Sequence, residues 1–233
     1  MKGKANVPRP YVLLSVATSV DGHIDDTSPS RLLLSNSEDF DRVDQVRADS
    51  DAILIGAGTI RADNPRLLVN SAERRNARIA AGKPEYPLKV TISASGDLDP
   101  DLKFWHHGGD KVAYTTDAAV DKLRDRLSGL ADVVSTGPEI SFGAVLDDLG
   151  KRGIGRLMVE GGGRIHTAFL SQGLADEIHL AIAPLLVGEE AAPRFLGPAS
   201  YPGGSTRRMQ LAEARTIGDV VLLRYLPKKE SNA

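Results

Sequence analysis

The chain has 233 residues, of which 41% are hydrophobic and 26% are charged, and its 29 Lys and Arg residues nearly balance 31 Asp and Glu residues. The resulting net charge of −2 gives no electrostatic footprint for nucleic acid or an anionic membrane. Cysteine is absent, which excludes a disulfide framework, a thiolate nucleophile and cysteine-ligated zinc or iron–sulfur clusters.

The N-terminal residues Met1–Asn6 do not lead into the apolar segment of a secretory signal. Apolar runs in the chain are also shorter than the roughly 18 residues of a membrane helix. We therefore expect a soluble cytoplasmic protein, with loosely held ends at Met1–Pro10 and Lys228–Ala233.

Apolar runs alternate with helical patterns over the first two thirds of the chain. Short runs rich in β-branched residues predict buried strands at Tyr11–Ala17, Ala52–Ile55, Leu88–Ile92, Val112–Thr115, Val133–Val134 and Arg156–Val159. The segments between them predict helices over Ser37–Asp49, with Ser37 as N-cap, and over Ala118–Leu130, Ser141–Arg152 and Ile165–Gln172.

The last third of the chain has a different pattern. Glu177–Ala183 alternates weakly, and two further runs, Gln210–Ile217 and Asp219–Leu226, flank Gly218 as in an antiparallel hairpin. Strand–helix alternation followed by antiparallel strands predicts an α/β fold with a mixed sheet. We expect one domain over residues 1–233, with an ordered core at about 11–226.

A run of three glycines, Gly161–Gly163, is the strongest local indication of chemistry. It separates a predicted strand from a predicted helix, and it lies between Glu160 and Arg164. Glycines let a ligand approach the main chain, and the free N–H groups of a helix N-terminus favour an anion such as a pyrophosphate. The alternative is a tight turn in which glycine serves packing alone.

A second glycine segment, Gly56–Pro65, follows the Ala52–Ile55 strand. Ligands of open α/β sheets bind beyond the carboxyl ends of strands, so both glycine segments are expected to line one crevice. Thr59 and Asp63 would add a hydroxyl and a carboxylate there, unless the segment is only a polar turn. Asp21-Gly22, after the first strand, is typical of a hairpin turn.

Five segments together resemble a known family: Ser19–Gly22, Asp51–Leu67, Val159–Gly163, Leu174–Glu177 and Ala183–Gly188. In this order they are similar to the reductase domain of the riboflavin-biosynthesis deaminase–reductase family, from about Tyr11 to Tyr225. The resemblance implies a dihydrofolate-reductase-like three-layer α/β sandwich with a mostly parallel central sheet and an antiparallel C-terminal hairpin. It also implies NADPH as cofactor and a homodimer.

The reaction implied is reduction of the ribosyl group of 5-amino-6-(5-phosphoribosylamino)uracil to a ribityl group. The family's partner activity, a zinc deaminase, needs cysteine ligands that this chain lacks, so we expect a stand-alone reductase. The five histidines have no metal-ligand spacing, and no metal site is expected. Two alternatives stay open, a dihydropterin or dihydrofolate-type reductase of the same fold and a non-catalytic NADPH-binding protein.

The resemblance also assigns site residues. It implies cofactor contacts at Thr18, Thr59, Asp63, Ser93, Gly161, Gly162, Gly163, Arg164 and Ile165, and substrate contacts at Arg47, Leu67, Asn70 and Glu160. A carboxyl group in a dry cleft can have a raised pKa, so Asp63 and Glu160 are the candidates for a catalytic proton relay.

Two departures from the family fall on the substrate side. Asn70 stands where the family has an arginine that contacts the substrate phosphate, and Ser30–Ser35 replaces a Ser-x-Trp segment. Arg31 or Arg66 could compensate for the missing charge. Because Asn70 cannot neutralise a phosphate, we expect a phosphorylated substrate, if it is used at all, to have a raised KM, which Asn70→Arg would lower with little change in kcat.

Overall fold

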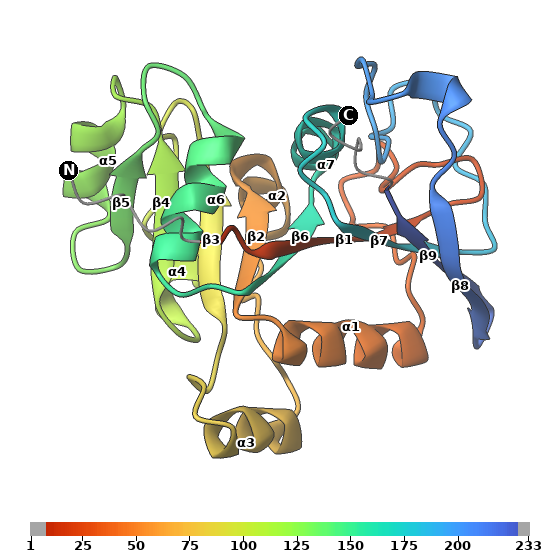
Figure 1. The fold of residues 1–233 in the computed structure, drawn as a ribbon, viewed down its shortest axis with the longest axis horizontal. Coiled ribbons are helices and arrows are strands. Elements are labelled where there is room, and N and C mark those ends of the chain that lie inside the picture. The colour runs from red at the N-terminus through yellow and green to blue at the C-terminus, as the bar shows by residue number, and fades with distance from the viewer. Residues whose placement is uncertain (1–7, 228–233) are drawn as a thin grey trace.

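The fold is described by a computed structural model for residues 8–227, so the predictions for residues 1–7 and 228–233 lie outside the described residues. Nine strands in this part form one sheet (Figure 1). They are β1 (Tyr11–Thr18), β2 (Ala52–Gly56), β3 (Leu88–Ile92), β4 (Lys111–Thr115), β5 (Asp132–Ser135), β6 (Arg156–Gly161), β7 (Glu177–Ile182), β8 (Gln210–Ile217) and β9 (Val220–Leu226).

The sheet is mostly parallel, in the order β5-β4-β3-β2-β6-β1-β7-β9-β8. All neighbours from β5 to β7 run parallel, whereas β9 is antiparallel to both β7 and β8. Gly218, with a φ of +58°, lies at the turn between β8 and β9. The predicted fold class, α/β with a mostly parallel sheet and an antiparallel C-terminal hairpin, is confirmed.

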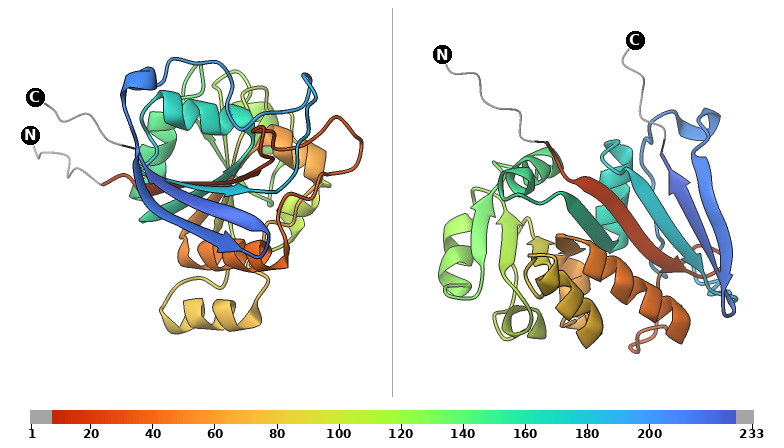
Figure 2. Two further views of the ribbon diagram at one scale, coloured as in Figure 1. Left: turned by 90° about the vertical axis from the view of Figure 1, so that its right-hand side faces the viewer. Right: turned by 60° about the horizontal axis from the view of Figure 1, so that its bottom comes forward.

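Helices cover both faces of the sheet. They are α1 (Ser37–Asp49), α2 (Ala57–Asp63), α3 (Ala72–Ala80), α4 (Lys103–His106), α5 (Val120–Arg126), α6 (Phe142–Lys151) and α7 (Gly163–Ser171). Figure 2 shows α7 on one side of the sheet and α1 on the other, with α3 projecting beyond α1. Within the described residues, no helix is long and apolar enough to cross a membrane.

Side chains alternate between two buried clusters along the central strands. On β2, Leu54 packs in a cluster with α6 and α7 residues, while Ile53 and Ile55 pack in a second cluster with α2, α4 and α5 residues. Alternate side chains of a strand point to opposite faces, so this strand is buried on both sides. The result is the predicted three-layer arrangement.

Most predicted elements are present, and their ends differ by a few residues. The N-cap of α1 is Asn36, whose side chain accepts a hydrogen bond from the N–H of Asp39, so the assignment of Ser37 was wrong. The segment after β2 forms the short helix α2, which ends at Asn64 in the left-handed conformation (φ +42°) before Pro65. Asn tolerates that conformation better than most residues and Pro65 restricts the residue before it, so the helix stops there.

Candidate active site

A cleft of about 1020 Å³ opens at the carboxyl ends of the central strands. Its walls include Ala17 at the end of β1, Gly56 at the end of β2, Ser93 after β3 and Gly161 at the end of β6. Both glycine segments therefore line one crevice, as their positions after parallel strands predict.

An irregularity in the sheet aims Glu160 into this cleft. The pairing of β2 with β6 shifts after Leu54, so that Val159 and Gly161 pair with successive β2 residues and Glu160 is the extra residue. A β-bulge of this kind redirects a side chain, often beside an active site.

Glu160 forms a bidentate ion pair with Arg47 of α1. Arg47 Nε lies 2.6 Å from Oε1 and Nη2 lies 2.7 Å from Oε2, while Nη1 donates to the carbonyl oxygen of Leu68 at 3.0 Å. Burial lowers the pKa of Arg47, but the charge and hydrogen bonds of Glu160 outweigh it, and the net pKa is raised. The two hydrogen bonds of the ion pair lock both side chains in one geometry.

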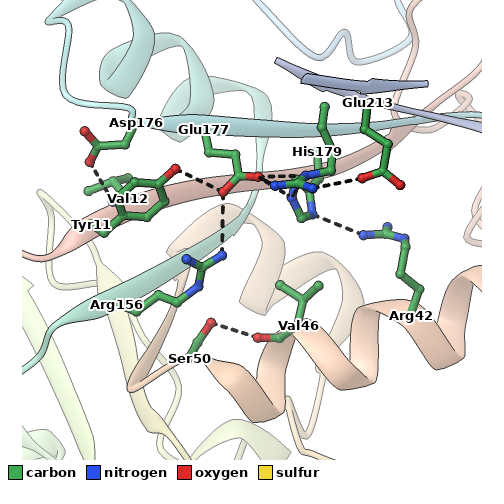
Figure 3. A network of polar contacts seen from close by, with 11 residues as sticks. Tyr11, Val12, Arg42, Val46, Ser50, Arg156, Asp176, Glu177, His179 and Glu213 are labelled. Atoms are coloured by element: carbon green, nitrogen blue, oxygen red, sulfur yellow. Dashed lines mark hydrogen bonds and ion pairs between the residues drawn. The ribbon is translucent and has the colours of Figure 1, made fainter. Parts of the chain in front are cut away.

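A polar network holds α1, and with it Arg47, against the sheet. Figure 3 shows Arg42 of α1 reaching His179 on β7, at 3.4 Å, and His179 beside Glu177, at 2.9 Å. Glu177 is buried, and it also accepts hydrogen bonds from Tyr11 and Arg224. Burial alone raises the pKa of Glu177, but its hydrogen bonds and the charges of His179 and Arg224 hold it at about 2.

The glycine run leads into the N-terminus of α7, which has no side-chain cap. The N–H groups of Ile165 and His166 bond to the carbonyl of Gly162, so those of Gly163 and Arg164 have no partner within the helix. A nine-residue helix with two free N–H groups at the cleft is suited to an anion.

The glycines serve packing as well as access. A Cβ on Gly163 would overlap the carbonyl oxygen of Arg194, and one on Gly56 would lie 2.8 Å from Ile165 Cγ1. A Cβ on Gly162 would lie 3.1 Å from Thr59 Oγ1, on the cleft wall. Gly163 is therefore explained by packing, because a side chain there would overlap the backbone of Arg194. Gly162 instead leaves open the space inside the cleft that a side chain would fill.

Asp63, the last residue of α2, presents a carboxyl group to the cleft. Burial raises its pKa above the ordinary value, the charge of Arg31 opposes this, and the Asp25 carboxylate adds to it. A carboxyl group with a raised pKa in a cleft is suited to proton transfer.

Most of the predicted site residues meet in this cleft, including Thr59, Asp63, Ser93, Gly161, Gly162, Gly163, Arg164, Ile165, Arg47, Asn70 and Glu160. Thr18 and Leu67 are not part of its lining. The side chain of Leu67 is buried with the α2 and α4 cluster, and Thr18 is buried at the end of β1. Sequence patterns did not place the buried His166 in the cleft wall, and its position there follows from how α7 packs in the folded protein.

Comparisons with known proteins agree on one family. Residues 10–223 match the family model described as the RibD C-terminal domain. The 2,5-diamino-6-ribosylamino-4(3H)-pyrimidinone 5′-phosphate reductase of Archaeoglobus fulgidus is 39% identical over 213 residues, which are 91% of this chain and 95% of the relative. The protein of the same name from Methanothermobacter thermautotrophicus is 30% identical over 94% of this chain and 99% of its own length.

Solved structures show the same fold. RibD of Acinetobacter baumannii has a TM-score of 0.78 at 24% identity, and the match covers 95% of this chain and 59% of that one. A pyrimidine reductase-like protein from Corynebacterium diphtheriae has a TM-score of 0.77 at 23% identity and matches over 93% of its length. The chain therefore belongs to the family of the RibD C-terminal reductase domain.

Proposed function

We propose that this protein is an NADPH-dependent reductase that converts the ribosyl group of a ribosylaminopyrimidine 5′-phosphate to a ribityl group. One observation carries the proposal. A single cleft joins a helix N-terminus suited to the phosphates of a dinucleotide with the locked Arg47–Glu160 pair, as a site for cofactor and substrate together requires. Membership of the family implies a nicotinamide cofactor.

The 2,5-diamino-6-ribosylamino-4(3H)-pyrimidinone 5′-phosphate is the first candidate substrate. Three relatives named for its reduction match over 95%, 99% and 85% of their own lengths. The deaminated compound, 5-amino-6-(5-phosphoribosylamino)uracil, is the second candidate, because relatives named RibD also match, at 30% identity over 58% of one such protein.

The residues present fit the proposed cofactor. The free N–H groups of Gly163 and Arg164 and the Arg164 guanidinium would hold its pyrophosphate, with Thr59 and Ile165 beside it. Ser93, buried after β3, is our candidate for the neighbourhood of the 2′-phosphate.

The chemistry needs one hydride and one proton. When bound, a nicotinamide cofactor supplies the hydride, which the open imine form of the ribosylamine accepts at C1′. The imine nitrogen then needs a proton, and Asp63 is the candidate donor. Because its pKa is raised, a larger fraction of its carboxyl group is protonated at a given pH than for an ordinary aspartate. Glu160 is less suited, because both of its oxygens already accept hydrogen bonds from Arg47, so its proposed role is to orient the substrate.

A homodimer is part of the proposal. Six of the eight residues of the edge strand β8 are exposed, and the hairpin presents Leu211 and Val221, 52% and 39% exposed. An exposed edge with apolar side chains is normally covered, and a twofold pairing is the commonest way to do so.

The test follows the loss of reduced-nicotinamide absorbance with each pyrimidine and with NADPH or NADH. We expect NADPH to be preferred and the diamino compound to have the higher kcat/KM. We expect Asp63→Asn to lower kcat most at low pH, where the Asp63 carboxyl group of wild type is protonated and can donate. Turnover of a dihydropterin but of neither pyrimidine would establish the alternative reductase. If the protein binds the cofactor but turns over none of these compounds, the remaining hypothesis is a non-catalytic NADPH-binding protein.

A further inference from the structure

The cleft contains five arginines, and their hydrogen bonds divide them into two groups. Three guanidinium groups are engaged: Arg42 bonds to Asp39, Arg47 to Glu160 and Arg61 to the carbonyl oxygen of Asp97. Within residues 8–227, the guanidinium groups of Arg31 and Arg164 have no hydrogen-bond partner. A free guanidinium in a cleft is available for an anionic group of a ligand.

These two free arginines belong to different parts of the cleft. Arg164 lies in the first turn of α7, where the cofactor phosphates are proposed to bind. Arg31 lies in the loop before α1, and its charge acts on Asp63, the proposed proton donor. Arg31 is therefore close enough to the proposed proton donor for its charge to act there.

The loop that carries Arg31 is held in place. Asp25 Oδ1 accepts hydrogen bonds from the N–H of Leu32 at 2.9 Å and from that of Asp26 at 3.0 Å. The loop is joined to a distant segment by a hydrogen bond from the N–H of Ile24 to Pro193. The backbone beside Arg31 is thus fixed, which reduces the entropy lost when its side chain binds a ligand.

Within the described residues, the arginines that contact the segment around Asn70, which are Arg47, Arg74 and Arg75, all have carboxylate partners. The Asn70 N–H bonds to Asp44, whose carboxylate is paired with Arg74 at 3.0 Å. Arg75 donates to the carbonyl of Asn70 and pairs with Glu85, and neither Arg75 nor Arg66 lines the cleft.

We propose that Arg31 binds the 5′-phosphate of the substrate, as the cation that position 70 lacks. The inference rests on the proposed function. A phosphate monoester carries close to two negative charges, and a guanidinium can bond two of its oxygens at once. With Arg31 in this role, the phosphorylated substrate does not need an arginine at position 70, and Asn70→Arg is expected to change KM little.

The test compares Arg31→Ala with wild type on the pyrimidine with and without its 5′-phosphate. Arg66→Ala, an exposed arginine outside the cleft, is the matched control. We expect Arg31→Ala to raise KM for the phosphorylated compound about 10- to 100-fold, as for loss of one charge-assisted contact. KM for the dephosphorylated compound and the Kd for NADPH should stay unchanged, and Arg31→Lys should lie between Ala and wild type.

An equal rise of KM for both pyrimidines, or no rise, would overturn the assignment. Weaker NADPH binding with unchanged pyrimidine KM would show that Arg31 belongs to the cofactor site instead. If wild type turns over neither pyrimidine, the proposed function fails, and calorimetry with ribose 5-phosphate and ribose still tests Arg31. Wild type should then prefer ribose 5-phosphate and Arg31→Ala should not, and an equal preference in both proteins would contradict the assignment.

Discussion

At the scale of single residues, the Arg47–Glu160 pair combines a structural and a functional role. The two side chains are 19% and 15% exposed, so water compensates little if one partner is lost. Removing one partner of a buried pair leaves an uncompensated charge, whereas removing both does not. A comparison of single and double variants therefore separates the effect of the pair on stability from its effect on activity.

We expect Glu160→Gln to lower the free energy of unfolding by about 2 kcal/mol and kcat/KM by about 100-fold. In Arg47→Met/Glu160→Gln, much of the stability should return while activity stays low. Urea denaturation and steady-state kinetics on the two single variants and the double variant check this. If activity recovers along with stability, the pair is only structural.

At the scale of elements, β3 contains a buried cation that joins two loops. Lys89 is 1% exposed, and its ammonium donates to the carbonyl of Arg66 at 3.0 Å and to that of Phe104. Burial and the charge of Lys111 lower the pKa of Lys89 to about 7. Lys89 thereby ties the segment after α2 to α4.

The lowered pKa makes stability depend on pH. Between about pH 7 and 10 the unfolded chain holds a proton on Lys89 that the folded protein has lost, so this group makes the free energy of unfolding rise with pH. The contribution has an upper limit of about 1.4 kcal/mol per pH unit.

The measurement is denaturation of wild type and Lys89→Met from pH 7 to 9.5. The free energy of unfolding of wild type, relative to that of Lys89→Met, should rise with pH. Lys122→Met, at an exposed position, is the control, and parallel curves for wild type and Lys89→Met would contradict the assignment.

At the scale of the whole molecule, the β8–β9 hairpin decides how copies of the chain would associate. Leu211 is paired with Tyr225 across the hairpin, yet its side chain remains half exposed. A charge at the centre of a buried interface is costly, whereas the same charge on a free surface costs almost nothing.

We expect light scattering to give twice the 24.9 kDa of one chain for wild type, and about one chain mass for Leu211→Glu. Ile79→Glu, at a 54% exposed site on α3, should leave the dimer intact. A wild-type mass near that of one chain at micromolar concentration would exclude the proposed dimer.

Much of the fold followed from local pattern. A strand buried on both faces, such as Ala52–Gly56, needs a short continuous apolar run, and the glycine at position 218 marks the turn of the last hairpin. The end of a helix depends on finer competition between neighbouring residues. For this reason the cap at Asn36 and the short helix α2 were not predicted.

The sequence by itself determined the order of elements, the family and the two glycine segments that line the cleft, because each depends on residues that are close in the chain. Only the tertiary structure decided which charges are paired. Arg47 and Glu160 are 113 positions apart, and the bulge that turns Glu160 toward Arg47 arises from pairing with β2. Within residues 8–227, Arg31 differs from Arg42, Arg47 and Arg61 of the same cleft because its guanidinium has no hydrogen-bond partner. Such a difference depends on every spatial neighbour at once, and no pattern along the chain records it.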